Sequence, residues 1–190
     1  AASLGGMKPM HRQSGLPIPG IVHVDQPYWF GSDRSQSEHD FGLATARAIE
    51  HKIEEIGADK VAAFIAEPVQ GAGGVIVPPD SYWPEIQRIC DEYGILLVAD
   101  EVICGFGRLG EWWGSLHLGI EPDLMPFAKG VTSGYQQLGG VILSRDVAAV
   151  LEDADRIVEV FEDVQEAQHL GAGLGVELLN LQGVALGDAV

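Results

Sequence analysis

The sequence predicts an α/β fold with a mostly parallel sheet. Short, continuously apolar runs, typical of strands that are covered on both faces, alternate along the chain with stretches in which apolar residues recur at helical spacing. Strands that alternate with helices form βαβ units, and their strands run parallel. With 190 residues, the chain has the length of one domain with a core of ordinary size.

The first part of the chain predicts a short β-rich run, a long helix and a buried strand. Residues 21–24 (Ile-Val-His-Val) are rich in β-branched side chains. Ser37, followed by acidic residues, is a typical helix N-cap, and apolar residues recur at helical spacing over 41–56. Gly57 is the expected C-cap. The continuous apolar run 61–66 predicts a strand buried on both faces.

The same alternation continues in the second part of the chain. A Pro-Pro-Asp sequence interrupts the chain and predicts a helix over 81–93. The apolar runs 95–99, 124–128 and 139–144 predict three further strands. The inner face of the helix is expected to carry apolar residues (Ile86, Ile89 and Cys90).

Charge and composition argue against several kinds of partner. Eleven Lys and Arg against 28 Asp and Glu give a net charge of −17, which disfavours nucleic acid and anionic membranes. The sequence has neither an apolar run of about 18 residues nor the pattern of a signal peptide, so we expect a cytoplasmic protein. Cys90 and Cys104 lack metal or disulfide spacing and the histidines are scattered. We therefore expect reduced thiols and no metal site.

Charged residues follow three neighbouring predicted strands. Glu67 follows the first of these strands, Asp100 the second and Lys129 the third. In an open α/β sheet, the carboxyl ends of the strands border the crevice where ligands bind. Pyridoxal phosphate needs a lysine for its Schiff base and an acid at its pyridinium nitrogen. The pattern therefore indicates an enzyme that uses pyridoxal phosphate.

Three motifs in a fixed order resemble a known family. They are Ala-Glu-Pro-Val-Gln-Gly-Ala-Gly-Gly at 66–74, Asp-Glu-Val-Ile-Cys-Gly-Phe-Gly-Arg at 100–108, and Ala-Lys-Gly with Ser-Gly-Tyr within 128–135. Together they resemble the large domain of the class III pyridoxal-phosphate-dependent aminotransferases. Shorter strings at 25–31, 82–84 and 111–114 resemble the branch that transfers amino groups from amines, including putrescine, or from ω-amino acids to pyruvate. The resemblance runs from the first residue to about residue 152.

The resemblance implies a role for four residues. Lys129 would form the Schiff base and move a proton, and Asp100 would bind the pyridinium nitrogen. Val102 would pack against one face of the ring, and Glu67 would lie beside the phenolic edge or gate a substrate carboxylate. The apolar and small neighbours of Lys129 predict a lowered pKa. Each residue also has a purely structural explanation: a solvated lysine, a turn-capping aspartate, a core valine and a loop acid.

The resemblance also implies an architecture and an assembly. The fold would be the three-layer α/β/α large domain of fold-type I enzymes, incomplete here, in a homodimer. Residues 1–152 would be part of the domain that binds pyridoxal phosphate, and residues 153–190 a divergent segment, a remnant of the small domain. The Thr-Tyr-Ser-Gly-His-Pro string of the family is absent after residue 152. We therefore expect a truncated or internally deleted copy.

Two other functions fit the same residues. A catalytically inactive fold would bind the cofactor or a partner chain without turnover. A racemase or a decarboxylase would share the lysine and the acid, because both reactions need the same bound cofactor. The sequence identifies neither the amine donor nor the oxo acid acceptor.

Overall fold

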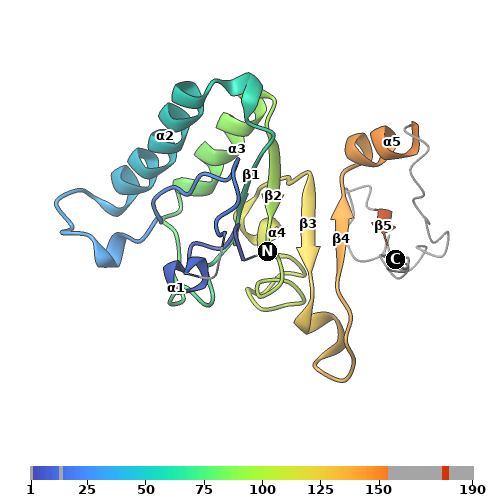
Figure 1. Cartoon of the computed structure of the whole chain (residues 1–190). Coiled ribbons are helices and arrows are strands. Elements are labelled where there is room, and N and C mark those ends of the chain that lie inside the picture. Colours follow the sequence, from blue (N-terminus) through green and yellow to red (C-terminus); the bar gives the residue numbers. More distant parts are fainter. Residues whose placement is uncertain (1, 13–14, 154–176, 180–190) are drawn as a thin grey trace. The chain divides into compact units, whose positions relative to one another are not determined.

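A computed structural model of the chain describes residues 2–12, 15–153 and 177–179. The chain forms two compact units (Figure 1). The first unit consists of Ala1–Val61 and Val69–Ile89, and the second of Ala62–Pro68 and Cys90–Val190. Each unit has its own set of secondary-structure elements, and the predicted site residues all belong to the second unit.

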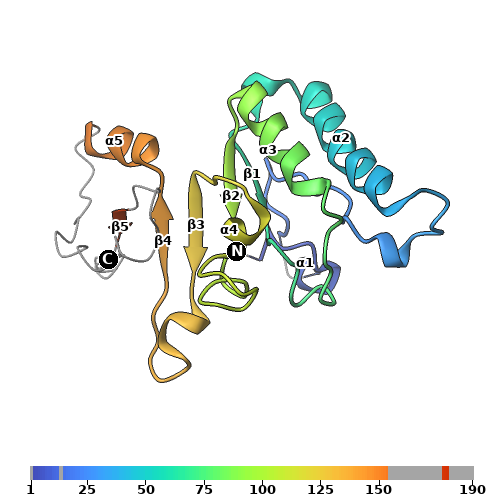
Figure 2. The same ribbon diagram turned by 180° about the vertical axis from the view of Figure 1, so that it is seen from behind.

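The first unit contains α2 (Glu38–Ile56) and most of α3 (Tyr82–Tyr93), which lie side by side in Figures 1 and 2. The predicted cap of α2 is confirmed, because the Ser37 hydroxyl accepts a hydrogen bond from the Asp40 N–H at 3.1 Å. Gly57 ends the helix with a φ of 93°, a conformation that glycine adopts without steric cost. The residues predicted for the inner face of α3 are all buried (Ile86, Ile89 and Cys90).

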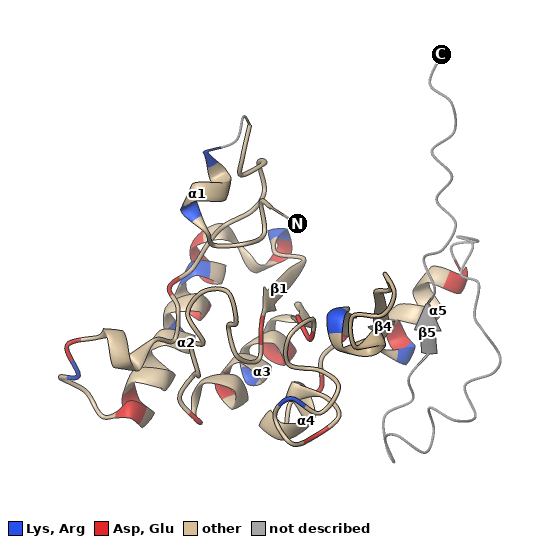
Figure 3. Ribbon diagram, turned by 90° about the horizontal axis from the view of Figure 1, so that it is seen from below, with Lys and Arg blue, Asp and Glu red and all other residues tan. Residues whose placement is uncertain are grey.

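Ion pairs join α2 to α3. Arg47 Nε lies 3.1 Å from Glu85 Oε1, and Arg88 Nη2 lies 2.8 Å from Glu50 Oε1 and 3.1 Å from Glu85 Oε1. The hydrogen bond from Arg88 is the main reason why the pKa of Glu85 is lowered, with a further contribution from Arg47. Along the part of the ribbon that is described, acidic and basic residues are interspersed in Figure 3.

The second unit contains a sheet whose strands lie in sequence order (Figure 1). The strands are β1 (Ala63–Ala66), β2 (Leu96–Ala99), β3 (Leu124–Phe127), β4 (Gly140–Leu143) and β5 (Glu177–Leu179). β1, β2 and β3 run parallel, β4 runs antiparallel to β3, and β5 runs antiparallel to β4. Of the strands in the described residues, all except β4 therefore point the same way. The predicted α/β fold with a mostly parallel sheet is confirmed.

The connection between β3 and β4 explains the reversed direction of β4. It contains a 3-10 helix, η3 (Lys129–Thr132), instead of the α-helix that usually carries the chain back for a parallel strand. The chain therefore returns beside β3 as in a hairpin. The apolar pattern of residues 139–144 predicted a strand, but such a pattern carries no information about direction.

Two predictions about strands are wrong in detail. Residues 21–24 are irregular, with Val22 and Val24 exposed, because β-branched residues favour a strand only where a neighbouring strand pairs with them. β1 is not buried on both faces: its residues alternate between exposed and half-buried. It lies at the edge of the described sheet, where Ile65 remains 36% exposed.

Aromatic side chains pack the loop after β2 onto the sheet. The buried cluster Ala99, Met125, Phe127 and Ile142 is contacted by Phe106, Trp113 and Val131. The rings of Phe106, Trp113 and Phe127 lie 5.0 to 6.1 Å apart in tilted or edge-to-face pairs, the arrangement that aromatic rings prefer. The long loop that follows β2 is thereby fixed against β3.

Short elements complete the described part of the chain. They are α1 (Lys8–His11), the 3-10 helices η1 (Trp29–Gly31) and η2 (Ala58–Lys60), α4 (Gly114–Leu118) and α5 (Arg145–Asp153). Among the described residues no helix is both long enough and apolar enough to cross a membrane. Most of the predicted C-terminal segment, 153–190, lies outside the described residues, and of its later part the structure describes β5.

Replacing Glu85 by Gln should lower the free energy of unfolding at neutral pH and should reduce how much that free energy falls in acid. Because the pKa of folded Glu85 is lowered, its stabilising contribution is present above the ordinary value of 4.5 and is lost as the pH falls below it. Denaturant unfolding should therefore show Glu85→Gln less stable than wild type at neutral pH, with the two curves converging in acid.

The control is Glu55→Gln, which removes the more exposed pair with Lys52. We expect it to change the free energy of unfolding by less than about 0.5 kcal/mol. An unchanged gap between wild type and Glu85→Gln at every pH would contradict this account.

Candidate active site

Glu67, Asp100 and Lys129 follow the carboxyl ends of β1, β2 and β3, so all three lie at the same end of the parallel strands. Ala66 lies opposite Ala99 in the β1–β2 pair, so Glu67 and Asp100 each follow a paired residue. β3 lies beside β2 and ends at Phe127, just before the segment that carries Lys129. Figures 1 and 2 show the loops after β2 and β3 at the same end of the sheet.

Asp100 is half-buried and divides its carboxylate between two uses. Its Oδ1 accepts a hydrogen bond from the Val102 N–H at 3.1 Å, which closes a local turn. Its Oδ2 has no hydrogen-bond partner among the described residues. The backbone N–H of Asp100 donates to the Ala66 carbonyl at 2.9 Å and so continues the pairing of β2 with β1. One carboxylate oxygen therefore caps a turn, as the purely structural explanation of Asp100 predicts. The other oxygen is open to a cationic ligand.

Lys129 begins η3 with a φ of 49°, in the left-handed region that non-glycine residues rarely adopt. Such backbone strain is found most often at functional sites, where the surrounding structure holds it in place. The residue is exposed. The apolar surroundings that the sequence predicted are therefore not formed by the described residues, because Ala128 and Gly130 are too small to cover the long side chain.

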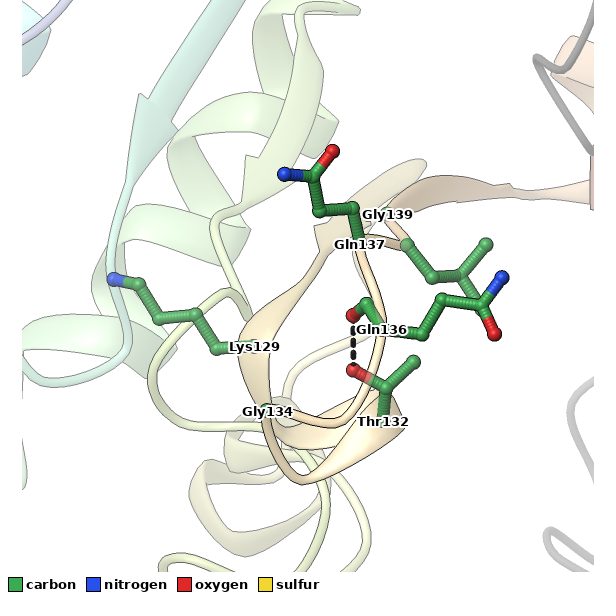
Figure 4. Close-up of a pocket in the computed structure, with 7 residues that line it drawn as sticks. Lys129, Thr132, Gly134, Gln136, Gln137 and Gly139 are labelled. Carbon is green, nitrogen blue, oxygen red and sulfur yellow. Dashed lines mark hydrogen bonds between the residues drawn. The ribbon is translucent and has the colours of Figure 1, made fainter.

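Lys129 borders a cavity of about 520 Å³ in the loop between β3 and β4. The Thr132 hydroxyl donates to the Gln136 carbonyl at 2.6 Å and closes this loop. In Figure 4 the Lys129 side chain points away from Thr132 and Gln136. The other residues of the lining are Gly134, Gln137, Leu138 and Gly139.

Val102 and Glu67 are both half-buried. Val102 therefore presents part of an apolar surface beside Asp100, as either a ring-packing residue or a core residue would. Glu67 is followed by Pro68, which is fully buried. The position of Glu67 at the end of β1 is compatible with its predicted roles and with that of a loop acid.

Glu101 is a buried residue of the site region to which sequence reasoning gave no role. Its side chain has no exposure to solvent. Its Oε2 accepts a hydrogen bond from the Gly114 N–H at 2.9 Å, and its Oε1 accepts one from the Ser115 N–H at 2.6 Å. These are the first two N–H groups of α4, which have no acceptor within the helix itself. Glu101 therefore joins the end of β2 to the start of α4.

Close packing surrounds this connection. A Cβ atom on Gly114 would lie 2.9 Å from the Cβ atoms of both Cys104 and Pro68. A Cβ atom on Gly105 would lie 2.9 Å from the Trp113 ring and 3.0 Å from the Glu101 carbonyl oxygen. Only glycine allows approaches this close. The glycines are therefore needed for Glu101 to reach α4.

An acid and an amine at neighbouring carboxyl ends of a mostly parallel sheet are typical of α/β enzymes that use pyridoxal phosphate. The chain belongs to the class III aminotransferases, since the model of the family "Aminotransferase class-III" matches residues 1–157. This membership agrees with the resemblance carried by the three sequence motifs.

Two curated relatives show how far the similarity extends. The chain is 57% identical over 159 residues to the putrescine–pyruvate aminotransferase of Pseudomonas aeruginosa, covering 84% of this chain and 35% of the relative. It is 47% identical over 155 residues to the diaminobutyrate–2-oxoglutarate transaminase of Halomonas elongata, covering 80% and 33%. The chain thus spans about a third of the length of these relatives.

Solved structures give the same result for the fold. The crystal structure of the omega transaminase from Pseudomonas jessenii in complex with PMP superposes with a TM-score of 0.79 at 43% identity. It covers 82% of this chain, which in turn covers 34% of that structure. A transaminase from a study of ancestral reconstruction gives a TM-score of 0.79 at 46% identity, covering 82% and 34%.

Class III aminotransferases depend on pyridoxal phosphate, and the residues at this edge of the sheet fit that cofactor. The open Oδ2 of Asp100 is an acceptor for a pyridinium N–H, and Lys129 supplies a primary amine. Val102 offers apolar surface for a ring, whereas the cavity of about 520 Å³ is bordered by Lys129 but by neither Asp100 nor Val102. For the phosphate, the described residues provide backbone N–H groups near Gly130, whereas the Thr132 hydroxyl already donates to the Gln136 carbonyl.

Substituting Gly114 by Ala should destabilise the protein. The added Cβ would overlap Cys104 and Pro68 at 2.9 Å, and overpacking of a buried site typically costs about 1–3 kcal/mol. Chemical denaturation measures the change in the free energy of unfolding. Gly6→Ala is the control, because a Cβ there meets no atom within 4 Å. Equal stability of Gly114→Ala and wild type would show that the packing around α4 adapts.

Proposed function

We propose that the protein to which this chain belongs is an aminotransferase that moves an amino group from an amine or ω-amino acid to pyruvate. One observation carries the proposal: Asp100, with an open carboxylate oxygen, and Lys129 follow neighbouring parallel strands of a class III chain. The putrescine–pyruvate aminotransferase named above supports the choice of donor and acceptor.

The bound cofactor would supply an electron sink that makes the hydrogen on the amine-bearing carbon acidic. Lys129 Nζ would hold the cofactor at its carbonyl carbon until the substrate amine displaces it. The freed amine would then, as general acid/base, move the proton from the amine-bearing carbon of the substrate to that cofactor carbon. Asp100 Oδ2 would accept the ring N–H and keep that nitrogen protonated. Val102 would pack on one ring face. Glu67 would border the phenolic edge or orient a substrate carboxylate.

The domain division and the assembly are part of the same proposal. Residues 1–152 would belong to the large domain that binds the cofactor, and 153–190 would be a remnant of the small domain. The end of the family match at residue 157 supports this boundary. A homodimer and a cytoplasmic location stay predictions from the sequence.

One observation favours a second candidate, a fold that binds the cofactor without turnover. Lys129 is exposed, and an amine that keeps its water lacks the desolvation that activates a lysine nucleophile. A racemase or decarboxylase would use the same lysine and acid. Analysis of products from an amine donor and pyruvate separates these alternatives, because only transamination yields alanine.

Borohydride reduction should attach pyridoxal phosphate to Lys129. An imine between the cofactor carbonyl and a lysine amine becomes a stable amine when reduced, and mass spectrometry of the digest locates it. We expect the label on the peptide that contains Lys129, and its loss in Lys129→Arg. Lys60→Arg, at another exposed lysine, should keep the label. Label at other lysines with none at Lys129 would refute the assignment.

Replacing Asp100 by Asn should slow proton abstraction strongly while changing cofactor binding modestly. The substitution keeps size but removes the charge that holds the ring nitrogen protonated, a loss of about 3–5 kcal/mol, or roughly a hundredfold to several thousandfold in rate. The measurement is the exchange of substrate hydrogen with solvent, made in the full-length protein. Asp146→Asn, on the exposed start of α5, should retain the rate. Near-normal exchange in Asp100→Asn would show that Asp100 is only a turn residue.

A further inference from the structure

The buried carboxylate of Glu101 has no role in the chemistry proposed above, although it lies next to Asp100 in the chain. A carboxylate without access to water is costly unless protein donors replace its hydration. Glu101 has such donors, because each of its two carboxylate oxygens accepts a backbone N–H of α4. Its burial therefore requires both Gly114 and Ser115 to stay in place.

The backbone of Glu101 is held as firmly as its side chain. Its N–H donates to the Pro126 carbonyl of β3 at 2.9 Å, and its carbonyl accepts the Gly105 N–H at 2.9 Å. Glu101 thus connects β3, the turn that follows β2, and α4. All four of its polar groups are used, and none of them faces solvent.

This anchoring fixes Asp100. The Asp100 N–H pairs with the β1 side of β2, at the Ala66 carbonyl, and the next N–H, that of Glu101, pairs with the β3 side. Consecutive residues of an extended chain direct their side chains to opposite faces. Since the Glu101 side chain points into the interior, that of Asp100 is directed to the other face, and the hydrogen bonds that hold the Glu101 backbone also fix the peptide bond that joins the two residues.

We propose that Glu101 is a positioning residue, which aims the Asp100 carboxylate at the cofactor ring nitrogen by tying the chain after β2 to α4 and β3. The proposal rests on the proposed function for the ligand of Asp100. The anchoring itself is a property of this chain without any ligand.

The chemistry of the two hydrogen bonds selects the test variant. Gln has the shape of Glu, but its NH₂ group would face one of the two backbone N–H donors, so one of the two bonds is lost. Glu101→Gln should therefore loosen the connection with little change in volume. Glu111→Gln is the matched control, because Glu111 is exposed in the same loop.

A double-mutant cycle on cofactor affinity tests the coupling in the full-length protein. Pyridoxal phosphate is titrated into wild type, Glu101→Gln, Asp100→Asn and the double variant. We expect Glu101→Gln to weaken binding measurably but by no more than Asp100→Asn does, because Glu101 acts only through Asp100. It should have no further effect once Asp100 is Asn. Glu111→Gln should bind as wild type does.

The cycle distinguishes failure of this inference from failure of the proposed function. If Glu101→Gln weakens binding equally in both backgrounds, Glu101 has a merely structural role and the inference is wrong. The same conclusion holds if Asp100→Asn weakens binding and Glu101→Gln does not. If Asp100→Asn leaves the affinity unchanged, the role assigned to Asp100 itself is wrong.

Hydrogen exchange of the unmodified protein provides a test that does not depend on a variant that folds. Val102 donates its N–H to Asp100, whereas Gly114 and Ser115 donate theirs to Glu101. If Glu101 holds Asp100 in place, the three amides open together and share one protection factor. Protection of Val102 that is more than about tenfold lower than that of Gly114 and Ser115 would overturn the inference.

Discussion

Burial of the Glu101 carboxylate constrains the whole edge of the sheet at which the candidate site lies. A carboxylate removed from water must recover its hydration from donors of fixed position. Glu101 replaces its lost hydration with hydrogen bonds from the first two N–H groups of α4. These N–H groups would otherwise lack acceptors, so the carboxylate and the start of the helix each supply the hydrogen bonds that the other needs. The contacts of its backbone with Pro126 and Gly105 extend the same constraint to β3 and to the turn after β2.

The residues around Glu101 follow from that constraint. For α4 to reach the carboxylate, its first residue must pass between Cys104 and Pro68, which leaves no room for a side chain at Gly114. Gly105 must likewise lie against the ring of Trp113. The edge-to-face and tilted contacts of Trp113 and Phe106 with each other and with Phe127 then close the loop over β3. Packing and hydrogen bonding thus support the same backbone path, which ends with Asp100 at the crevice.

Sequence reasoning succeeded where the signal is local. The Ser37 cap, the helical spacing of α2 and the apolar runs of β2 and β3 depend on neighbours within a few residues, and the structure has them. Glu101 was missed because its partners lie 13 and 14 residues away. The sequence did contain a usable signal. A second acid follows Asp100 directly after a buried strand, and a Gly-rich turn and a Trp-Gly-Ser sequence come after it. The direction of β4 was missed for another reason: an apolar run predicts a strand, but only the length and form of the connection before it decide how the strand runs.

The candidate site has an acid half around Asp100 and an amine half around Lys129, and this chain forms the first more completely than the second. The acid half is held by β1, β2, β3 and α4, and every polar group of Glu101 in it is hydrogen-bonded. The amine half lies on a loop that the Thr132–Gln136 bond closes, and Lys129 is exposed there in a strained backbone conformation. Within the described residues nothing covers the Lys129 side chain. A ring bound between the two halves, or a further protein surface, would complete the amine half as α4 and β3 complete the acid half.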